Sequence, residues 1–366
     1  MKNKTAVQDR KVMREDVTIH YLDYRIKKEE SGQKIRSLLY ERMKLSTRKI
    51  RALKKNSRGL LLNGEPVTVR RTVREGDLLQ AMLDDSQEGF GQKHILPIPM
   101  KFPILYEDED LLFINKPSGM VCHPSKGHLT DTLCNGVSGY FQRTGQNAGI
   151  HLFGRLDKDT SGIVGIAKNK VAAERMQLLR EQGLFRKEYL ALISGRPPCF
   201  SGTITMPMEE DRSEGVLKMH VGTGPSAKKA VTRYQTLRCF SGSVQENFTG
   251  SRSKTGGVRE NADDGCLHAG NDGGASLCRV IIETGRTHQI RFHMASLGCP
   301  LLGDLLYGGE IRNKKGMKRT ALHAWKVRFP HPFTEKEVII TARLPEDMTG
   351  AINGMKRAEE QEAKKK

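Results

Sequence analysis

The segment HLFGRLDKDTSGIVGIAKN, residues 151–169, places two carboxylates close together, on Asp157 and Asp159. Carboxylates can act as nucleophiles, as general acids or bases, or as calcium ligands. The run that begins at Asp157 matches the first half of an EF-hand loop, but position twelve of such a loop must be a bidentate Glu and here it is Lys168. We therefore do not expect calcium. The remaining interpretations are acid–base or nucleophilic chemistry, or a turn that the aspartates cap through hydrogen bonds.

Motifs for several other kinds of chemistry are absent from the sequence. A Walker A loop needs Gly-Lys followed by Ser or Thr, and none of the 37 glycines precedes a lysine. The run Gly222-Thr223-Gly224 lacks the third glycine of a dinucleotide fingerprint, and no H-E-x-x-H motif occurs. The seven cysteines form no C-x-x-C pair, which favours free thiols in a reducing cytosol. The sequence therefore predicts neither a metal nor a cofactor.

The charge balance indicates the kind of partner. The 366 residues carry 61 Lys and Arg against 42 Asp and Glu, a formal net charge of +19. Such an excess favours a polyanion, either nucleic acid or an anionic membrane surface. No stretch approaches 18 apolar residues, and the basic N-terminus lacks the apolar core of a secretory signal. Because no basic amphipathic helix with an apolar aromatic face is evident either, we expect nucleic acid and no membrane.

A strongly basic region near the N-terminus predicts two helices. Residues 25–58 carry thirteen Lys or Arg against three Glu. The first predicted helix has apolar residues at helical spacing, namely Ile35, Leu38, Leu39 and Met43. The second is predicted to start at an N-cap within Leu45-Ser46-Thr47 and to turn Ile50 and Leu53 inward. Its other face carries four cations, Arg48, Lys49, Arg51 and Lys55.

The segment that follows these helices predicts a β-hairpin. In LLLNGEPVTVR, β-prone runs flank Asn63-Gly64, and VREGDLLQAML adds another turn and strand. This order resembles the S4-like RNA-binding domain, a small module named after a small-subunit ribosomal protein and attached to many RNA-modifying enzymes. The resemblance implies that Arg48, Lys49, Arg51 and Lys55 contact RNA phosphates. The alternative is a solvated basic helix with no ligand.

The rest of the chain mixes helices and strands without a regular βαβ alternation. Residues 241–275 are predicted to form a disordered insertion, because Gly, Ser, Asn and Asp dominate them. We divide the chain into a disordered basic tail (1–17), the S4-like domain (18–83), a linker (84–102), a second domain (103–346) and a frayed charged tail (347–366). The expected fold class is α+β: a small basic α/β RNA-binding domain, then a domain built on a mixed, largely antiparallel sheet with flanking helices.

Five segments of the chain resemble the RluA-type pseudouridine synthases. Residues 151–169 resemble the family signature H-R-L-D-x-x-T-S-G followed by a strand ending in A-K, although Gly154 stands where the family usually has His. Four more segments match family motifs in the same order: FINKPSGMVCHP, RKEYLALISG, ETGRTHQIRFHMASLGCPLLGD and LHAWKVRFPHP. The resemblance covers about residues 18–345 and implies that the second domain is catalytic, with the pseudouridine synthase fold.

The resemblance also implies a reaction and roles for three residues. RluA-type enzymes detach uracil from its ribose in RNA, rotate it and reattach it through carbon 5, with no redox cofactor. By matching position, Asp157 is the essential carboxylate, acting on either the sugar or the base. Tyr189 is expected to stack on the flipped uracil or to relay a proton. Arg291 is expected to pair with Asp157 and to keep it ionised.

Further residues are expected to contact RNA. Arg286 and Thr287 lie at the start of a predicted helix over 287–297, where a helix N-terminus suits either a phosphate or a structural cap. Arg155 and Lys168 flank the catalytic loop and are expected to position backbone phosphates. His123 and His288 are expected to be structural.

The sequence thus predicts an isomerase, an RNA pseudouridine synthase that acts on ribosomal RNA of the large subunit. Ribosomal RNA is favoured because the S4-like module is common in such family members. Transfer RNA as the substrate and a non-catalytic RNA-binding protein are the alternatives. The protein is expected to be a cytoplasmic monomer whose partner is RNA.

Overall fold

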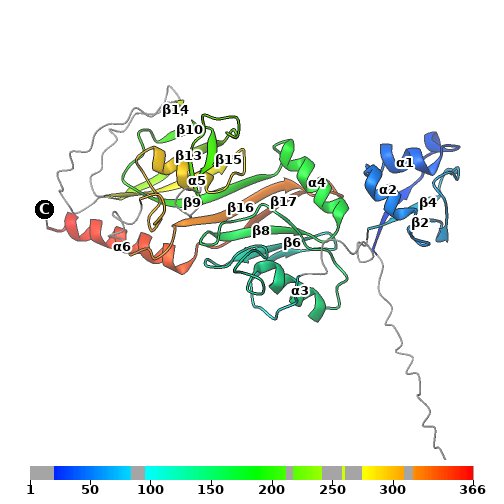
Figure 1. Cartoon of the computed structure of the whole chain (residues 1–366), viewed down its shortest axis with the longest axis horizontal. Helices are drawn as coiled ribbons and strands as arrows, with labels where there is room; N and C mark the ends of the chain where they lie inside the picture. Colours follow the sequence, from blue (N-terminus) through cyan, green and yellow to red (C-terminus); the bar gives the residue numbers. More distant parts are fainter. Residues whose placement is uncertain are drawn as a thin grey trace, which may run out of the picture. The chain divides into compact units, whose positions relative to one another are not determined.

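The computed structural model describes residues 20–83, 95–211, 217–240, 258–259, 274–308 and 316–365. The chain divides into two compact units near Gly91, and the second comprises residues 92–143 and 150–366 (Figure 1). The predicted tail 1–17, the first part of the predicted linker and nearly all of the predicted insertion lie outside the described residues. Among the residues described, no helix is long and apolar enough to cross a membrane.

The first unit is built on a four-stranded antiparallel sheet with the strand order β1-β4-β2-β3. Its elements are β1 (Tyr21–Arg25), η1 (Lys28–Glu30), α1 (Ile35–Glu41), α2 (Thr47–Leu53), β2 (Leu60–Leu62), β3 (Glu65–Pro66) and β4 (Leu78–Met82). Helices α1 and α2 stand together on one side of the sheet (Figure 1). Asn63 and Gly64 have φ angles of 54° and 86°, the left-handed turn that a two-residue hairpin needs. The predicted helices and hairpin are therefore present.

The second helix differs from its prediction in one of its four cations. Ser46 caps α2 as expected, since its Oγ accepts a hydrogen bond from the backbone N of Lys49. The Lys49 side chain, however, is only 5% exposed, and its Nζ donates to the carbonyl of Leu83 at 3.2 Å. Lys49 lies on the inward face beside Ile50 and Leu53, where a long side chain can reach a carbonyl across the core. The expected phosphate contact of Lys49 is therefore wrong.

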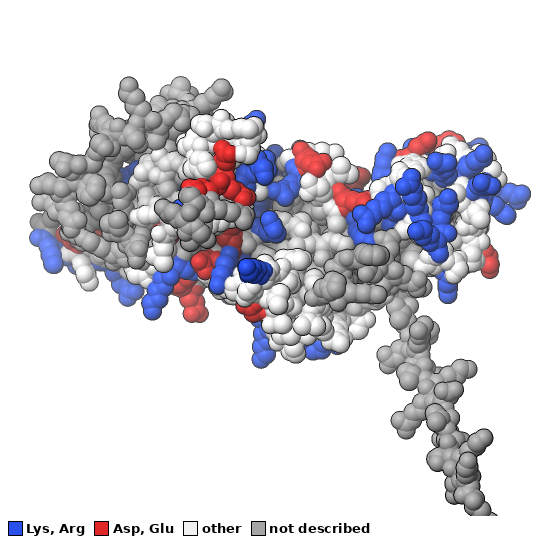
Figure 2. Space-filling view, in the orientation of Figure 1, with Lys and Arg blue, Asp and Glu red and all other residues white. Residues whose placement is uncertain are grey.

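The other three cations of that set remain exposed. Arg48 and Arg51 lie on the outer face of α2. Because the helix ends at Leu53, Lys55 lies in the turn beyond it and not on the helix as predicted. Figure 2 shows Lys and Arg side chains gathered on the surface of this unit. The described part of the first unit therefore presents a basic surface.

The second unit is built on an eleven-stranded sheet whose main order is β14-β10-β13-β15-β9-β16-β8-β6-β5, with β17 beside β16 and β7 beside β8. Its elements are β5 (Ile104–Glu107), β6 (Leu111–Lys116), α3 (Leu133–Arg143), β7 (His151–Phe153), β8 (Ser161–Ala167), α4 (Lys170–Glu181), β9 (Arg186–Ser194), β10 (Ser201–Thr205), β11 (Met208–Asp211), β12 (Lys218–Val221), β13 (Val231–Phe240), β14 (Val258–Arg259), β15 (Ala275–Ile282), α5 (Gln289–Ser296), β16 (Leu322–Pro330), β17 (Glu337–Thr341) and α6 (Glu346–Ala363). Among the described strands, every pair is antiparallel except β16 with β8. The predicted α+β class with a largely antiparallel sheet is confirmed.

The parallel pair lies beside the loop that carries the two aspartates. Ser161 pairs with His323 and Gly162 with Ala324 at the start of β8. Gly162 has a φ of 113°, and a Cβ there would lie 2.2 Å from the carbonyl oxygen of Ala324. Only glycine allows this approach, since any side chain would collide with the neighbouring backbone. The Thr-Ser-Gly part of the signature therefore brings the loop before β8 next to β16 and β9.

Part of the predicted linker belongs to the second unit. The backbone N of Ile98 donates to the carbonyl of Asn135 at 3.0 Å, and the Asn135 amide donates to the carbonyl of Leu96 at 2.9 Å. A Cβ at Gly139 would lie 2.4 Å from the Ile98 carbonyl oxygen, so the segment lies directly on α3. Helix α3 itself was not predicted, and the segment from Ile95 to Phe102 is packed against it instead of linking domains.

The predicted frayed tail is instead an ordered helix. Helix α6 spans Glu346–Ala363, and Met348, Ile352 and Met355 on it are buried. These residues recur at a spacing of four and three, so they form one apolar face on a helix. That face packs in a core cluster with Phe240 and Leu302. The charged composition of the last residues obscured this stripe.

The strands on either side of the predicted insertion are paired neighbours. Phe240, the last residue of β13, pairs with Ala275, the first residue of β15. Ala275 is fully buried and belongs to β15, so the boundary predicted at residue 275 is one strand residue too late. The backbone of Val258–Arg259 forms β14 and pairs with β10.

Two buried histidines predict a loss of stability in mild acid. His293 and His323 are fully buried, and burial lowers the pKa of each to about 4. The unfolded chain binds a proton on each below about pH 6.5, so in this window it binds more protons than the folded protein. Their contribution to stability is complete above pH 6.5 and is lost as the pH falls toward 4. At pH 5 we expect the free energy of unfolding to be lower by about 2 kcal/mol per histidine.

Urea unfolding of the full chain at pH 7.5 and pH 5.0 measures this effect. The Nδ1 of His323 lies 2.9 Å from Ser161 Oγ, so His323→Gln keeps a polar group there but cannot titrate. This variant should lose less stability than the wild type between the two pH values. Equal losses in both proteins would show that His323 does not carry the pH dependence.

Candidate active site

A cleft of about 1200 Å³ opens in the second unit between β7, the loop before β8, α4, β9, the end of β15 with the loop after it, and the start of α5. It is lined by the three residues predicted to be catalytic, Asp157, Tyr189 and Arg291. Three of the predicted RNA contacts in this domain, Arg155, Arg286 and Thr287, line it as well. The fold therefore brings together residues that lie more than 130 positions apart in the sequence.

The loop that carries Asp157 is held from behind by a buried lysine. The backbone N of Thr160 donates to the Asp157 carbonyl at 3.2 Å, which closes a turn. Lys116 is fully buried, and its Nζ donates to three carbonyls, those of Pro117, Met120 and Lys158, at 2.8, 2.8 and 3.0 Å. Burial lowers the pKa of Lys116 to about 8. Lys116 therefore fixes the Asp157 loop from behind, through its bond to the Lys158 carbonyl.

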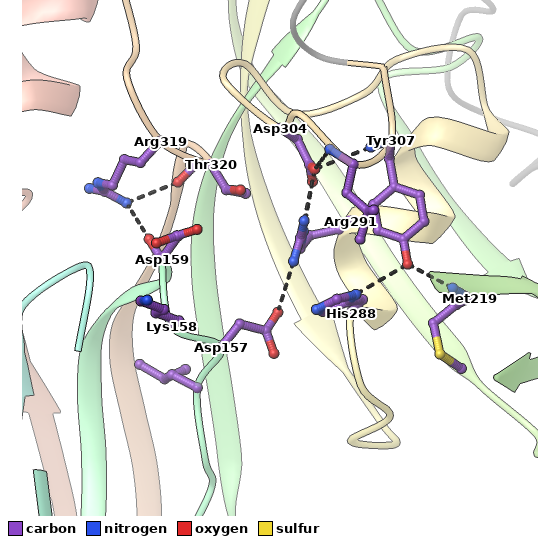
Figure 3. A network of polar contacts seen from close by, with 12 residues as sticks. Asp157, Lys158, Asp159, Met219, His288, Arg291, Asp304, Tyr307, Arg319 and Thr320 are labelled. Atoms are coloured by element: carbon purple, nitrogen blue, oxygen red, sulfur yellow. Dashed lines mark hydrogen bonds and ion pairs between the residues drawn. The ribbon is translucent and has the colours of Figure 1, made fainter. Parts of the chain in front are cut away.

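Asp157 faces Arg291, and Arg291 is clamped by a second aspartate (Figure 3). The Arg291 Nη1 lies 3.9 Å from Asp157 Oδ2. Its Nε and Nη2 donate to the two carboxylate oxygens of Asp304 at 2.7 and 2.8 Å, and Asp304 is fully buried. Burial alone would lower the pKa of Arg291, but the bonds and charge of Asp304 outweigh it and raise that pKa. The guanidinium is thus a fixed positive charge aimed at the Asp157 carboxylate.

Two aromatic residues complete the support of Arg291. Its guanidinium lies 5.3 Å from the centre of the Tyr307 ring. The Tyr307 hydroxyl contacts His288 Nδ1 at 3.2 Å and accepts from the backbone N of Met219 at 2.9 Å (Figure 3). Burial lowers the pKa of His288, so the imidazole is neutral at physiological pH. These contacts fit the structural role expected for His288.

Tyr189 lies in the middle of β9 and is only 5% exposed. Burial raises its pKa, and the negative charge of Asp157 raises it further. Its phenol therefore stays protonated at neutral pH and can donate a hydrogen bond or a proton.

In the loop before α5, several of the polar groups predicted to contact RNA already form hydrogen bonds within the protein. The Gln289 side chain accepts from the backbone N of Arg286 at 3.0 Å and from the hydroxyl of Thr284 at 2.8 Å. The Nε of Arg286 donates to the carbonyl of Lys229. Helix α5 begins at Gln289 and not at Thr287. Because the Gln289 side chain accepts from it, the backbone N–H of Arg286 is not available to a phosphate. Only the remaining guanidinium nitrogens of Arg286 are available to a ligand in the cleft.

Lys168 is not part of the site. It follows the far end of β8, a strand of seven residues, and thus lies roughly 20 Å from the Asp157 loop. Its Nζ forms an ion pair with Glu107 at 2.7 Å, and the Lys168 side chain is only 8% exposed. The expected phosphate contact beside the Asp157 loop is wrong, because an extended strand of seven residues separates Lys168 from that loop in space.

Three residues of the site were not predicted from the sequence. Asp304 is the last residue of the family-like motif ETGRTHQIRFHMASLGCPLLGD, and Lys187 lies in the family-like motif RKEYLALISG, but neither residue was given a role. Arg180, on α4, occurs in no recognised motif; its Nη2 lies 2.1 Å from where a Cβ of Gly285 would be, so glycine there makes room for the guanidinium. No local signal distinguishes Arg180 from any other exposed arginine near a helix end.

The cleft has an excess of positive charge. Its lining includes seven basic residues, Arg155, Arg180, Arg186, Lys187, Arg233, Arg286 and Arg291. It includes three acidic ones, Asp157, Glu181 and Glu283. Since a concave, mostly cationic surface concentrates anions, the arrangement suits a polyanionic ligand.

One further polar cluster could in principle hold a cation. Asp108, Asp110 and His331 place a donor atom each within 4.8 Å of one another. These donors already serve the protein: His331 Nε2 contacts Asp108 at 3.0 Å, and Asp110 accepts from Asn169 at 2.8 Å. The residues do not line the cleft, and the cluster fits a structural role.

The comparisons with known proteins define the class of this protein. The family model described as RNA pseudouridylate synthase matches residues 110–296, which include the Asp157 loop, β9 and α5. The chain belongs to the RNA pseudouridylate synthase family and is an RNA pseudouridine synthase, an isomerase.

Individual relatives extend the similarity over most of the chain. This chain is 34% identical over 310 residues to the uncharacterized RNA pseudouridine synthase YjbO of Bacillus subtilis, and the match covers 85% of this chain and 95% of the relative. It is 32% identical over 314 residues to the ribosomal large subunit pseudouridine synthase D of Vibrio parahaemolyticus, covering 82% and 84%. A solved structure, human RNA pseudouridylate synthase domain containing 4, is 25% identical with a TM-score of 0.49 and covers 69% of this chain and 92% of that one.

Proposed function

We propose that this protein isomerises specific uridines in ribosomal RNA, with Asp157 as the essential carboxylate. The observation that carries the proposal is the charge arrangement in the cleft. Asp157 faces a guanidinium that a fully buried aspartate holds in place, and both Asp157 and Arg291 line a cleft rich in cations. A carboxylate held in this way can attack an electron-poor carbon of the sugar or of the base, and the fixed Arg291 offsets the charge that shifts during the step.

The uridine must leave its helical stack to reach Asp157. The volume of the cleft is sufficient for a flipped nucleotide and part of the flanking backbone. Tyr189 offers an aromatic ring to the extruded base and a protonated hydroxyl near the reacting atoms. Arg155, which is exposed in the cleft lining, is placed to contact the phosphates on either side of the flipped nucleotide.

Ribosomal RNA of the large subunit is the substrate we favour. The support is the similarity, at 32% identity, to two proteins named ribosomal large subunit pseudouridine synthase D. Mapping of pseudouridine across total RNA, with and without this protein, tests the substrate. Sites that disappear from ribosomal RNA in the absence of the protein, and return with it, are expected. Loss of sites in transfer RNA alone would replace this substrate, and no lost site anywhere would contradict the proposed function.

We also propose that the first unit is an S4-like RNA-binding domain, and that the protein acts as a cytoplasmic monomer. The exposed Arg48, Arg51 and Lys55 support the RNA-binding role. The six cysteines among the described residues are free thiols, which suits a reducing compartment.

Salt dependence tests the basic surface of the first unit. Changing Arg48, Arg51 and Lys55 together to Gln should weaken RNA binding, because fewer counterions are released from the RNA. If each cation contacts one phosphate, the slope of log affinity against log salt should become shallower by about 2, using about 0.7 per charge for single strands. The measurement is an RNA-binding titration across a salt series.

The matched control makes the same change to three exposed cations of the C-terminal helix region, Arg357, Lys364 and Lys365. This control should leave the salt slope near that of the wild type. An equal change in the two triple variants would mean that total charge, and not the basic surface of the first unit, sets RNA affinity.

A further inference from the structure

Lys187 is a buried cation in the cleft lining that the proposed reaction does not use. It lies on β9 and is 6% exposed. Its Nζ donates to the carbonyl of Gly154 at 2.8 Å. Within the described part of the chain, no carboxylate forms an ion pair with it. Because burying an ammonium without a counter-charge is costly, a side chain of this kind at a site calls for a functional explanation.

Both groups that Lys187 contacts belong to the catalytic machinery. Gly154 lies three residues before Asp157, on the loop that enters the cleft from β7. Tyr189 lies two residues after Lys187, on the same face of β9, and its ring centre is 5.5 Å from the Lys187 Nζ. A single ammonium group thus connects the strand that carries Tyr189 to the loop that carries Asp157.

The backbone at Gly154 is suited to this contact. Gly154 has a φ of 66°, in the left-handed region that glycine enters without cost. A Cβ at this position would lie 3.5 Å from the Lys187 Nζ and 4.0 Å from the Phe185 ring. The absence of a side chain leaves the Gly154 carbonyl as the group that meets the ammonium at this point in the cleft wall.

We propose that Lys187 is a positioning residue, which fixes the Asp157 loop relative to Tyr189 by holding the Gly154 carbonyl and supporting the Tyr189 ring. The inference rests on the proposed function, since it assigns a role in that same reaction. Because both groups are held in one geometry before the uridine reacts, less conformational entropy is lost in reaching the transition state.

The charge state of Lys187 gives this role a distinct signature. Burial, opposed by the negative charge that Cys122 can carry and aided by the positive charges of Arg180 and Lys116, lowers its pKa to about 7. The ammonium is therefore present below pH 7 and is lost as the pH rises. The neutral amine donates a weaker hydrogen bond to Gly154 and no longer attracts the Tyr189 ring. The rate should fall above pH 7 for this reason.

Three variants test the proposal in the full chain. Lys187→Met keeps the length of the side chain without the charge, and Lys187→Arg keeps a charge that does not titrate. Lys336→Met is the matched control, because Lys336 is exposed and does not line the cleft. The measurements are thermal melting, RNA affinity and the single-turnover rate of pseudouridine formation at saturating enzyme from pH 6 to 9.

We expect Lys187→Met to slow the single-turnover step by about tenfold to a hundredfold at pH 6.5. RNA affinity should change by less than about threefold, because the cleft keeps its other cations. The variant should also lose the fall in rate above pH 7, and Lys187→Arg should stay active without that fall. The Lys336→Met control should behave as the wild type.

The proposal is overturned if Lys187→Met has the rate and the pH profile of the wild type. If Lys187→Met does not fold, the Arg variant decides: a fall in rate near pH 7 equal to that of the wild type would remove Lys187 as its cause. These outcomes differ from a failure of the proposed function, in which the wild type itself would form no pseudouridine on any RNA.

Discussion

Replacing Asp157 with Asn is expected to abolish pseudouridine formation. Asn has nearly the same size, but it carries no negative charge and is a poor nucleophile. If the carboxylate forms or breaks the bond at the uridine, the single-turnover rate should fall by at least about 10³-fold, as for other essential nucleophiles. RNA affinity should stay within about tenfold, or 1.4 kcal/mol, because Asp157 is one group in a large basic cleft.

A neighbouring aspartate provides the control for this experiment. Asp159 lies in the same turn and is exposed, but it does not line the cleft. Asp159→Asn should therefore retain activity within a few-fold of the wild type. The rates are compared by single-turnover assay on a ribosomal RNA fragment that contains a mapped site. Substantial turnover by Asp157→Asn would remove Asp157 from the catalytic role.

The second large effect is expected at Asp304, which does not line the cleft. Asp304 is fully buried and accepts both of the short bonds that fix Arg291. Asp304→Asn would leave the guanidinium without its counter-charge and free to turn toward Asp157. Removing one partner of a buried ion pair costs about 3 kcal/mol of stability or more. We also expect the single-turnover rate to fall about a hundredfold, since Arg291 loses its position.

The chain offers a second arginine–aspartate pair as a control. Arg319 donates to both carboxylate oxygens of Asp347, but Asp347 is 44% exposed. Because solvent screens that pair, Asp347→Asn should cost about 1 kcal/mol or less and leave the rate unchanged. Urea unfolding and single-turnover rates of both variants give the comparison. Wild-type activity in a folded Asp304→Asn protein would show that the clamp on Arg291 is not needed.

The sequence by itself determined the elements that local chemistry dictates. The helical spacing of Ile35, Leu38 and Leu39 predicted α1, and the run Leu45-Ser46-Thr47 predicted the start of α2. Asn63-Gly64 predicted the hairpin, because few other residues adopt two successive left-handed conformations. The mixture of helices and strands predicted the α+β class, and motif resemblance predicted the family. Each of these conclusions depends on a short stretch of chain or on ordered motifs.

The sequence misjudged places where a residue's surroundings come from elsewhere in the chain. Lysine is usually a surface residue, yet the Lys49 side chain is buried, where its Nζ donates to the carbonyl of Leu83, more than thirty residues away in the sequence. Lys168 is close to Asp157 in the sequence, but β8 separates the two in space, and Lys168 forms an ion pair with Glu107. The composition of the last residues is that of an exposed segment, yet Met348, Ile352 and Met355 on α6 pack against residues of β13, β15 and the segment after α5.

The site itself divides in the same way. The sequence determined Asp157, Tyr189 and Arg291 as candidates, because each lies in a recognisable motif. Only the tertiary structure decided that all three line one cleft and that Arg291 is held chiefly by Asp304, with Asp157 at a longer distance. It also decided that Lys187 contacts both the loop after β7, through the Gly154 carbonyl, and the Tyr189 ring on its own strand β9. The physical reason is that burial and charge pairing depend on which distant segments the sheet brings together, and no local pattern encodes these contacts.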